Sequence, residues 1–512
     1  MPHIFLYGPS GAGKSTIGKF LARDLNLPFV GSDEVIESNV GMSIPQIMEE
    51  QGETSVRDFE TAVLKQIIKN KESIVALGGG ALLREENRAL IEKSGRVVLL
   101  KAEASTLFER LQRDSNQRPL LAGDLKAKLA SYLEKRAEHY ASFPLKVHVD
   151  GRTPEQIAKQ IQVTIGQYHL SAMGEYDALV QSVEQVGHLL FQRELQNPIV
   201  VTDEHVARFH AERVFTSLRN AGFTPQIVTI PAGEAYKNLD TVQKLWNAFL
   251  EHGLDRRSTV IALGGGVIGD TAGFAAATYM RGVNWVCVPT TLLSMVDASL
   301  GGKTGFDLPQ GKNLIGSFYP PKLVLADPQL LKSLPKAEFI SGMAEVVKHG
   351  IIADPELFEL CAQGLGCVTE NLEKVVKRGM AVKIKIIEDD PYEKGFRAAL
   401  NLGHTVGHAV ELVSRFELRH GEAVAMGMVA EARLAERLGR AEQGLSDKIG
   451  EVLSALGLST QIPRELSRAE IVRTMRVDKK KNAKAIRFAL PIEIGKVELV
   501  EISDLESVLE ES

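Results

Sequence analysis

The sequence has few cysteines, no excess of basic charge and no long apolar run. Its 512 residues contain only three cysteines (Cys287, Cys361 and Cys367), too few for a disulfide framework, so we expect lone thiols in a reducing compartment. The 60 Lys and Arg against 65 Asp and Glu give a net charge of −5, which argues against nucleic acid as a main partner. No uncharged apolar run reaches the roughly 18 residues of a membrane span, so no membrane partner is expected.

The chain does have the length and composition of a multidomain globular protein. At roughly 100–200 residues per domain, its length predicts two to four domains. A hydrophobic share of 44% with 24% charged residues excludes a disordered or fibrous chain. The start, Met1–Gly8, reads as a buried strand and a glycine turn, without the basic region or cleavage site of a signal peptide. We therefore expect a cytoplasmic protein.

Residues 1–165 have the pattern of an α/β domain. Short apolar segments alternate with longer helical patterns, the order that builds a parallel sheet. The predicted strands are His3–Tyr7, Leu27–Val30, Ser73–Leu77, Arg96–Leu100 and Lys146–Val149. The predicted helices are Lys14–Leu25, Ser55–Lys69, Asp124–Ser142 and Pro154–Ile165. Residues 166–175 have weak periodicity, which predicts a linker.

A second α/β pattern, typical of a Rossmann-like domain, covers residues 176–334, and residues 335–512 are expected to be mainly helical. The predicted strands of the second pattern are Pro198–Thr202, Gln226–Ile230, Thr259–Leu263, Trp285–Val288 and Lys322–Ala326. Helical periodicity then dominates to roughly Leu458. A short extended piece, Ala485–Leu490, precedes an acidic tail. The predicted order is α/β, then α/β, then mostly α.

The segment Gly8–Ser15, with the sequence GPSGAGKS, fits the phosphate-binding P-loop pattern in full. It follows a predicted strand and opens a predicted helix, as the mechanism requires. The Lys14 ammonium can reach the β and γ oxygens of a nucleotide, and the Ser15 hydroxyl can bind Mg²⁺. The predicted ATP-binding residues of this segment are Gly11, Ala12, Gly13, Lys14, Ser15 and Thr16. The motif identifies the phosphate donor but not the acceptor.

The residues that follow resemble shikimate kinase, in family order, over about the first 165 residues. The matching positions are Ser32–Glu37, Gly52, Glu53, Arg57, Glu60, Gly78–Gly80, Arg118–Leu121, Arg136 and Tyr140. An acceptor that is a small hydroxylated carboxylic acid needs a bidentate cation, which arginine supplies. The resemblance implies that shikimate is bound by Asp33, Arg57, Gly78, Gly79, Gly80 and Arg136.

The same resemblance implies further roles in this domain. Asp33 would orient or deprotonate the attacking hydroxyl, and Arg118, in a lid, would act with Lys14 on the charge of the transferring phosphoryl group. Arg152 is the candidate that stacks on adenine. One position departs from the family, because Gly31 replaces an aspartate that usually holds a water on Mg²⁺. We expect a working kinase; the alternative is a nucleotide-binding module that has lost catalysis.

The segment Gly264–Gly269 contains the G-x-G-x-x-G spacing after a predicted strand. This spacing alone is a weak signal for dinucleotide binding, because glycine-rich turns between strands and helices are common. Neighbouring segments strengthen it: Pro231–Lys237, Pro289–Leu293, Asp297, Gly301–Lys303 and Gly311–Asn313.

Three histidines within 17 positions give a separate signal for a metal. His404 and His408 are spaced i, i+4 on one face of a predicted helix, and His420 follows. Thr405 stands where an H-E-x-x-H motif has its glutamate, so metalloprotease chemistry lacks its base. The pattern by itself leaves both a metal site and buried core histidines open.

Residues 175–512 resemble 3-dehydroquinate synthase. Further matching positions are Gly342–Lys348, Lys383, Asp390, Glu393, Arg397–Asn401 and Asp478–Lys480. The resemblance implies an NAD- and Zn²⁺- (or Co²⁺-) dependent conversion of 3-deoxy-D-arabino-heptulosonate 7-phosphate to 3-dehydroquinate, with release of phosphate. The implied metal ligands are Glu345, His404 and His420, which leave open positions for substrate oxygens. The implied catalytic residues are Lys348, Lys383, Arg397 and His408.

The resemblance also implies two larger binding sets. The NAD-binding set is Asp203, Gly233, Glu234, Lys237, Gly265, Gly266, Val267, Gly269, Asp270, Thr290, Thr291, Asp297, Lys303, Lys312 and Ser333. The substrate-binding set is Arg281, Lys303, Asn313, Lys348, Lys383, Arg397, Asn401, His408 and Lys479, with Lys480 as the alternative to Lys479. Two positions depart from the family pattern, since His205 and Asp307 stand where the family usually has asparagine.

The leading hypothesis is a bifunctional enzyme of the shikimate pathway that acts on small molecules. Homodimerisation through the synthase half is a further hypothesis. A rival hypothesis makes the second half an NAD- and metal-dependent polyol dehydrogenase of the glycerol dehydrogenase type. Such an enzyme needs no phosphate pocket, and Lys303, Lys312 and Arg397 argue against it.

Overall fold

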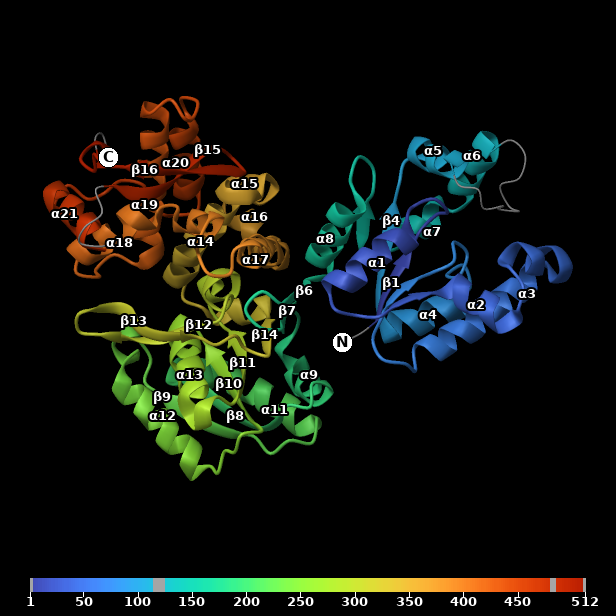
Figure 1. The fold of residues 1–512 in the computed structure, drawn as a ribbon, viewed down its shortest axis with the longest axis horizontal. Coiled ribbons are helices and arrows are strands. Elements are labelled where there is room, and N and C mark those ends of the chain that lie inside the picture. Colours follow the sequence, from blue (N-terminus) through green and yellow to red (C-terminus); the bar gives the residue numbers. More distant parts are fainter. Residues whose placement is uncertain (1–2, 114–124, 479–484, 510–512) are drawn as a thin grey trace. The chain divides into compact units, whose positions relative to one another are not determined.

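The computed structural model describes residues 3–113, 125–478 and 485–509 (Figure 1). The chain divides into two compact units, Met1–His169 and Leu170–Ser512. Across the described ranges, no helix is both long enough and apolar enough to span a membrane.

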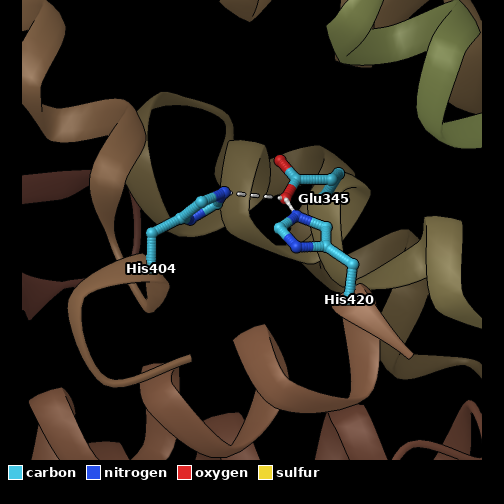
Figure 2. A group of neighbouring side chains, drawn as sticks. All are labelled: Glu345, His404 and His420. Atoms are coloured by element: carbon cyan, nitrogen blue, oxygen red, sulfur yellow. Dashed lines mark ion pairs between the residues drawn. The ribbon is translucent and has the colours of Figure 1, made fainter. Parts of the chain in front are cut away.

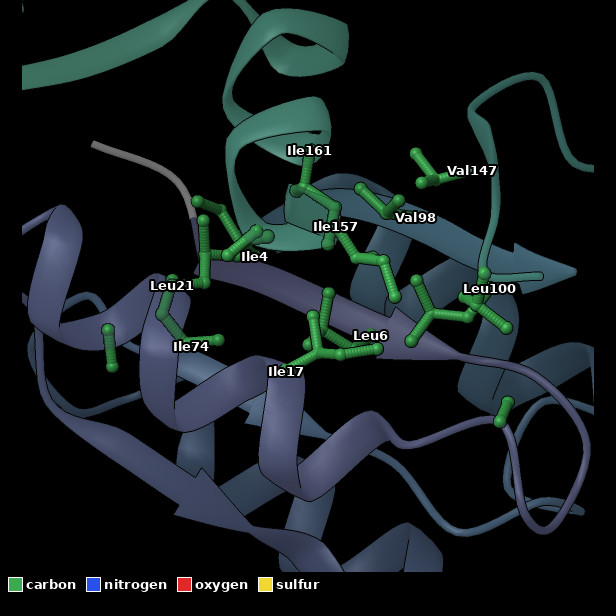
Figure 3. Close-up of a cluster of buried hydrophobic side chains, with 14 of the residues drawn as sticks. Ile4, Leu6, Ile17, Leu21, Ile74, Val98, Leu100, Val147, Ile157 and Ile161 are labelled. Carbon is green, nitrogen blue, oxygen red and sulfur yellow. The ribbon is translucent and has the colours of Figure 1, made fainter. Parts of the chain in front are cut away.

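The first unit is built on a five-stranded parallel sheet in the order β2-β3-β1-β4-β5. Its strands are β1 (His3–Tyr7), β2 (Phe29–Gly31), β3 (Ile74–Ala76), β4 (Gly95–Lys101) and β5 (Lys146–His148), which confirms the predicted strands with small shifts of their ends. Every residue of β1 is buried, because helices cover both faces of the sheet. Ile4 and Leu6 pack with Ile17 and Ile157 on one face (Figure 3), while Phe5 packs on the other.

The helices of the first unit form two layers around this sheet. Helices α1 (Lys14–Asp24), α5 (Ala104–Arg113), α6 (Leu125–Lys135) and α8 (Pro154–Ile165) contribute to one core, and α2 (Ser32–Val40), α3 (Ile44–Ile67) and α4 (Glu85–Ser94) to the other. Two predictions were wrong in extent. The helix expected to begin at Ser55 begins at Ile44, where the Ser43 hydroxyl accepts a hydrogen bond from the Gln46 N–H, and Gly52 (φ 82°) interrupts it. The helix expected over Asp124–Ser142 is divided at Arg136 into α6 and α7 (Ala137–Ala141).

The second unit contains six strands of a seven-stranded sheet in the order β6-β7-β14-β11-β10-β8-β9, and the edge strand β6 spans the division at residues 169 and 170. Five strands confirm predictions: β8 (Gln196–Asp203), β9 (Gln226–Ile230), β10 (Ser258–Gly264), β11 (Asn284–Pro289) and β14 (Leu323–Ala326). Two were not predicted, β6 (Gln167–Leu170) and β7 (Tyr176–Val180). Strand β6 lies within residues 166–175, which were predicted as a linker, and a four-residue edge strand carries too little periodicity to be recognised.

Helices and a hairpin complete the α/β part of the second unit. The helices include α9 (Val186–Gln192), α10 (Glu204–Val206), α11 (Glu212–Asn220), α12 (Leu239–Glu251) and α13 (Gly266–Thr278). The antiparallel hairpin β12 (Lys303–Leu308) and β13 (Gly311–Phe318) was not predicted. Most of β13 is exposed, so its side chains lack the alternation of a half-buried strand.

The remainder of the second unit is mainly helical, as predicted. It comprises α14 (Lys336–Ala353), α15 (Pro355–Ala362), α16 (Gly364–Glu370), α17 (Leu372–Asp389), α18 (His404–Val413), α19 (His420–Arg437), α20 (Leu445–Ala455) and α21 (Arg468–Asp478). The expected extended piece is strand β15 (Ile486–Glu493), and it pairs with β16 (Lys496–Ile502). The segment expected to be an acidic tail is thus partly a strand, and Phe488 and Leu490 of β15 pack in the core formed with α18 and α19.

Candidate active sites

The P-loop of the first unit has the predicted position between β1 and α1. Gly8 has φ 142°, and a Cβ there would lie 2.5 Å from the Leu100 carbonyl oxygen, so only glycine fits. Gly13 (φ 88°) caps α1, and the first N–H groups of that helix are therefore available to an anion. The Lys14 ammonium donates to the carbonyl oxygens of Gly8 (3.0 Å) and Pro9 (3.1 Å), which holds this cation over the loop. The loop thus has the geometry that phosphate binding requires.

Arg110 of α5 lies at the same loop and was missed by the sequence reasoning. Its guanidinium donates to the Gly11 and Val149 carbonyl oxygens, both at 3.4 Å. It therefore joins the P-loop to the segment that precedes Arg152, which is exposed. The predicted lid residue Arg118 lies outside the described residues.

The predicted shikimate-binding residues come together around the glycines that follow β3. A Cβ at Gly80 would lie 2.2 Å from the Arg57 guanidinium, and one at Gly78 would lie 2.7 Å from Asp33 Oδ1. The Arg136 guanidinium donates to the Gly79 carbonyl oxygen and lies 4.0 Å over the ring of Tyr132. The cations of Arg57 and Arg136 and the carboxylate of Asp33 thus surround the turn Gly78–Gly80, where the residues carry no side chains.

Glu60 orients Arg57 within this group. The Glu60 side chain is 4% exposed, and its two carboxylate oxygens accept from Arg57 Nη1 at 2.9 and 2.8 Å. Glu53 accepts from the other terminal nitrogen at 2.7 Å. Burial raises the pKa of Glu60 above its ordinary value, although the charge of Arg57 opposes this effect. Glu60 belongs to the motif that the sequence shows, but its role as the buried partner of Arg57 becomes visible only in the fold.

In the second unit, the glycine-rich turn Gly264–Gly266 joins β10 to α13, as predicted for a dinucleotide site. The Thr290 N–H donates to the Gly264 carbonyl oxygen at 2.9 Å, which places the end of β11 beside the turn. A Cβ at Gly265 would lie 3.0 Å from Thr291 Cγ2. The start of α13, including Val267 and Gly269, therefore lies beside Thr290 and Thr291, at the carboxyl ends of two parallel strands.

A second group of predicted NAD-binding residues surrounds Lys237. The buried Lys237 ammonium lies 2.7 Å from Asp270 Oδ2 in the first turns of α13, and it donates to Asn313 Oδ1 of the hairpin. Burial alone would lower the pKa of Lys237, but the charge of Asp270 raises it. Asp307 Oδ1 accepts from the Asn313 N–H at 2.7 Å. The aspartate at position 307 therefore makes a contact within the hairpin. Burial raises the pKa of Glu234, which belongs to the same group.

Three other predicted NAD-binding residues have local partners. Asp203 Oδ1 accepts from the His205 and Val206 N–H groups at 2.9 Å and so caps α10. The Ser333 hydroxyl lies 2.7 Å from His210 Nε2. Asp297 Oδ1 lies 2.7 Å from the Lys383 ammonium, which puts this carboxylate among the predicted substrate cations.

The three predicted metal ligands converge in the second unit. Glu345 of α14 points its carboxylate between His404 of α18 and His420 of α19 (Figure 2). Glu345 Oε1 lies 3.4 Å from His404 Nε2 and 3.6 Å from His420 Nε2. The candidate donor atoms of all three residues lie within 4.8 Å of one another. The Glu345 carboxylate is buried; Oε2 pairs with the Lys348 ammonium and Oε1 faces the two histidines, an arrangement that fits a carboxylate that binds a cation.

The other ring nitrogen of each histidine is held by a neighbouring acceptor. His404 Nδ1 lies 3.1 Å from the Leu402 carbonyl oxygen, and His420 Nδ1 lies 3.3 Å from Glu411 Oε2. Such contacts leave Nε2 of each ring free to bind a metal. Burial and the charge of Lys348 hold the pKa of His404 well below its ordinary value, whereas, despite burial, the carboxylates of Glu345 and Glu411 raise the pKa of His420 to about 9. One carboxylate and two imidazoles match the ligands that Zn²⁺ takes in catalytic sites.

The predicted substrate cations are partly gathered beside these ligands. The Lys348 ammonium pairs with Glu345, and the rings of His408 and His404 have centroids 5.2 Å apart. Glu393 pairs with Lys303 and, at 3.4 Å, with Nε of Arg397. Lys348 and Arg397 are each 1% exposed, which is unusual for cations and favours an anionic ligand.

Two predicted substrate residues, Arg281 and Asn401, are not gathered with the others in the part of the chain that is described. Arg281 is exposed at the end of α13 remote from the glycine-rich turn, with φ 68°, and forms no ion pair with another candidate in the ranges that are described. Asn401 is exposed at the end of a short 3₁₀ segment, Phe396–Asn401. Lys479, together with its alternative Lys480, lies outside the described residues.

Family models match most of the chain in three parts. Residues 10–166 match shikimate kinase, residues 227–341 match the 3-dehydroquinate synthase N-terminal model, and residues 342–481 match the C-terminal one. The 3-dehydroquinate synthase of Rippkaea orientalis is 45% identical over 324 residues, which are 62% of this chain and 88% of that protein. The chain belongs to the 3-dehydroquinate synthase family and carries a shikimate kinase domain ahead of it. The two units are called the kinase unit and the synthase unit below.

Two solved structures are similar to the synthase unit. A 2-deoxy-scyllo-inosose synthase complexed with carbaglucose-6-phosphate, NAD⁺ and Co²⁺ is 27% identical, with a TM-score of 0.61, covering 67% of this chain and 99% of that one. A 2-epi-5-epi-valiolone synthase from Streptomyces hygroscopicus with NAD⁺ and Zn²⁺ bound is also 27% identical, with a TM-score of 0.60, covering 65% and 94%. Both relatives hold a dinucleotide and a divalent metal.

Proposed function

We propose that the chain catalyses two reactions of the shikimate pathway. The synthase unit converts 3-deoxy-D-arabino-heptulosonate 7-phosphate to 3-dehydroquinate, and the kinase unit phosphorylates shikimate with ATP. The observation that carries the first assignment is the cluster of Glu345, His404 and His420 beside buried cations. The 45% identity to a 3-dehydroquinate synthase favours this substrate over those of the two solved relatives, at 27%.

The synthase unit uses NAD and Zn²⁺ or Co²⁺, in line with the groups bound to the two solved relatives. Glu345, His404 and His420 would hold the metal, and the turn after β10 with Thr290 and Lys237 would hold the dinucleotide. When bound, NAD⁺ accepts and later returns one hydride while the metal polarises the oxygens of the carbinol and the ketone.

The protein's own residues bind the anionic ends of the substrate and move its protons. Lys303, Lys383 and Arg397 would neutralise the phosphate and the carboxylate and so stabilise the charge that develops as phosphate leaves. Lys348, held at Glu345, would bind a hydroxyl near the metal. His408, whose ring is 5.8 Å from that of His420, is the candidate for proton transfer.

The kinase unit would bind ATP at the P-loop and shikimate at the turn that follows β3. The P-loop with Lys14 and Ser15 holds the phosphates of ATP and Mg²⁺, and Arg152 lies along the adenine. Arg57 and Arg136 bind the shikimate carboxylate, and Asp33 orients the hydroxyl that attacks the γ-phosphate. Glu60 supports Arg57 through the buried ion pair.

A polyol dehydrogenase of the glycerol dehydrogenase type is the second candidate for the synthase unit. It would act on an uncharged substrate, and the cations would then outnumber their carboxylate partners, because Lys303 and Arg397 share the single carboxylate of Glu393. We also propose a cytoplasmic location, where ATP and NAD are both available, and homodimerisation through the synthase unit.

One purified preparation, assayed twice, tests the proposal. We expect phosphate release from the sugar phosphate without net NADH formation, and ADP formation that depends on shikimate. Net NADH formation from a polyol, without phosphate release, would identify the dehydrogenase instead. ADP formation that shikimate does not stimulate would identify the kinase unit as a degenerate module.

A further inference from the structure

Glu411 contacts His420, a candidate metal ligand, and also Lys312 of the hairpin β12–β13, which carries residues of the predicted dinucleotide site. It lies on α18 with His404 and His408, at positions i, i+4 and i+7, which lie on one face of the helix. Its side chain is 8% exposed. Glu411 Oε2 lies 3.3 Å from Nδ1 of His420, and Oε1 accepts from the Lys312 ammonium at 2.7 Å. Each carboxylate oxygen thus has one partner.

The contact with His420 decides which ring nitrogen faces Glu345. A carboxylate is an acceptor only, and the two nitrogens of the His420 ring each face one, Nδ1 toward Glu411 and Nε2 toward Glu345 Oε1 at 3.6 Å. A metal that binds at Nε2 would replace the proton on that atom, and Glu411 would keep the remaining proton on Nδ1. A carboxylate behind an imidazole also makes the imidazole a stronger ligand.

The contact with Lys312 comes from a separate part of the fold. Lys312 is at the start of β13, 99 residues before Glu411 in the sequence, and its ammonium lies 4.4 Å from the centre of the Phe416 ring. The same hairpin contributes Asn313, which accepts from the buried Lys237 beside α13. A shift of the hairpin on dinucleotide binding would therefore act on Glu411 directly.

We infer that Glu411 is a positioning residue that fixes His420 toward the metal and couples metal binding to dinucleotide binding through Lys312. The inference rests on the proposed function in that Lys312 belongs to the NAD-binding set. Thermodynamic linkage requires the coupling to be reciprocal, so NAD⁺ tightens Zn²⁺ binding by the same factor by which Zn²⁺ tightens NAD⁺ binding.

The test measures Zn²⁺ affinity in the full-length protein by competition with a chromophoric chelator, with and without NAD⁺. Glu411→Gln keeps the shape of the side chain, but its amide cannot accept from both His420 and Lys312. We expect Zn²⁺ binding about 10–100-fold weaker than in the wild type. Glu417→Gln is the matched control, because it removes the same charge from an exposed side chain in the loop between α18 and α19. Thermal unfolding of each metal-free variant checks that the synthase unit is folded.

The coupling has its own measurement. We expect NAD⁺ to tighten Zn²⁺ binding roughly 5-fold or more in the wild type, in the usual range of allosteric coupling. The factor should approach 1 in Glu411→Gln and in Lys312→Met, which keeps an apolar chain against Phe416. Wild-type Zn²⁺ affinity in Glu411→Gln, an equal loss in Glu417→Gln, or a wild-type protein indifferent to NAD⁺ would each overturn the inference. Retention of Zn²⁺ by Glu345→Ala would instead contradict the proposed metal site.

Discussion

The carboxyl group of Glu34 lies against Gly31. A Cβ at Gly31 would be 2.9 Å from Glu34 Cδ and 3.1 Å from its Oε2. The backbone of Gly31 is extended (φ −91°, ψ 115°), so this position does not require glycine for conformational reasons. The Glu34 carboxyl group thus occupies the space beside position 31, where the resemblance to shikimate kinase implies an aspartate.

This relationship predicts that Glu34 supplies the carboxylate that position 31 lacks. Glu34→Gln should raise the Mg²⁺ concentration for half-maximal kinase rate by about 10-fold or more, the usual effect of losing an outer partner of a metal. Gly31→Asp alone should give no gain, because it brings a second negative charge against Glu34. The double variant should recover the wild-type Mg²⁺ requirement. Mg²⁺ titrations at saturating shikimate decide between these outcomes, and an unchanged titration in Glu34→Gln would contradict the prediction.

Lys14→Ala should abolish most kinase activity and leave synthase turnover unchanged. The lysine charge stabilises the transferring phosphoryl group, and losing one such contact costs on the order of 100–1,000-fold in rate. The measurement is ADP formation with shikimate, compared with phosphate release by the synthase unit of the same preparation. A kinase that kept its rate would show that Gly8–Ser15 is only a structural turn.

Glu60→Gln should raise the KM for shikimate more than it lowers kcat. Loss of a charged hydrogen bond is worth about 1.5–3 kcal/mol, or roughly 10–100-fold in binding, when it fixes the group that holds the substrate. Glu53→Gln is the control, because it removes the exposed partner of the same arginine, whose contribution is smaller. Equal KM values for the two variants would show that the buried pair does not position Arg57.

Removal of the metal should stop the synthase and spare the kinase when Mg²⁺ is in excess. Glu345→Ala and His404→Ala should each lose bound Zn²⁺ and phosphate release, since each removes one of three donors. Metal analysis of the purified variants, with both activity assays, checks this expectation. Stoichiometric Zn²⁺ in a variant that carries both substitutions would contradict the assignment of Glu345 and His404 as metal ligands.

The sequence by itself determined the α/β class, the central strands of both sheets and the main chemical motifs. These features are local: a buried parallel strand is a short apolar run, and the P-loop and the histidines of α18 are close in sequence. The resemblances placed Glu345 with His404 and His420, and Arg57 with Arg136, and the fold brings each group together.

Only the tertiary structure decided which polar groups become partners across the chain. Strands β6, β7 and β16 and the hairpin β12–β13 depend on hydrogen-bond partners elsewhere, and their short or exposed segments carry weak periodicity. Glu411, Arg110 and Glu34 look like ordinary charged residues on helices until folding places His420, the P-loop and Gly31 beside them. Contacts such as Lys312 with Glu411 join residues 99 positions apart, and no local pattern specifies which distant carboxylate a buried or half-buried cation will meet.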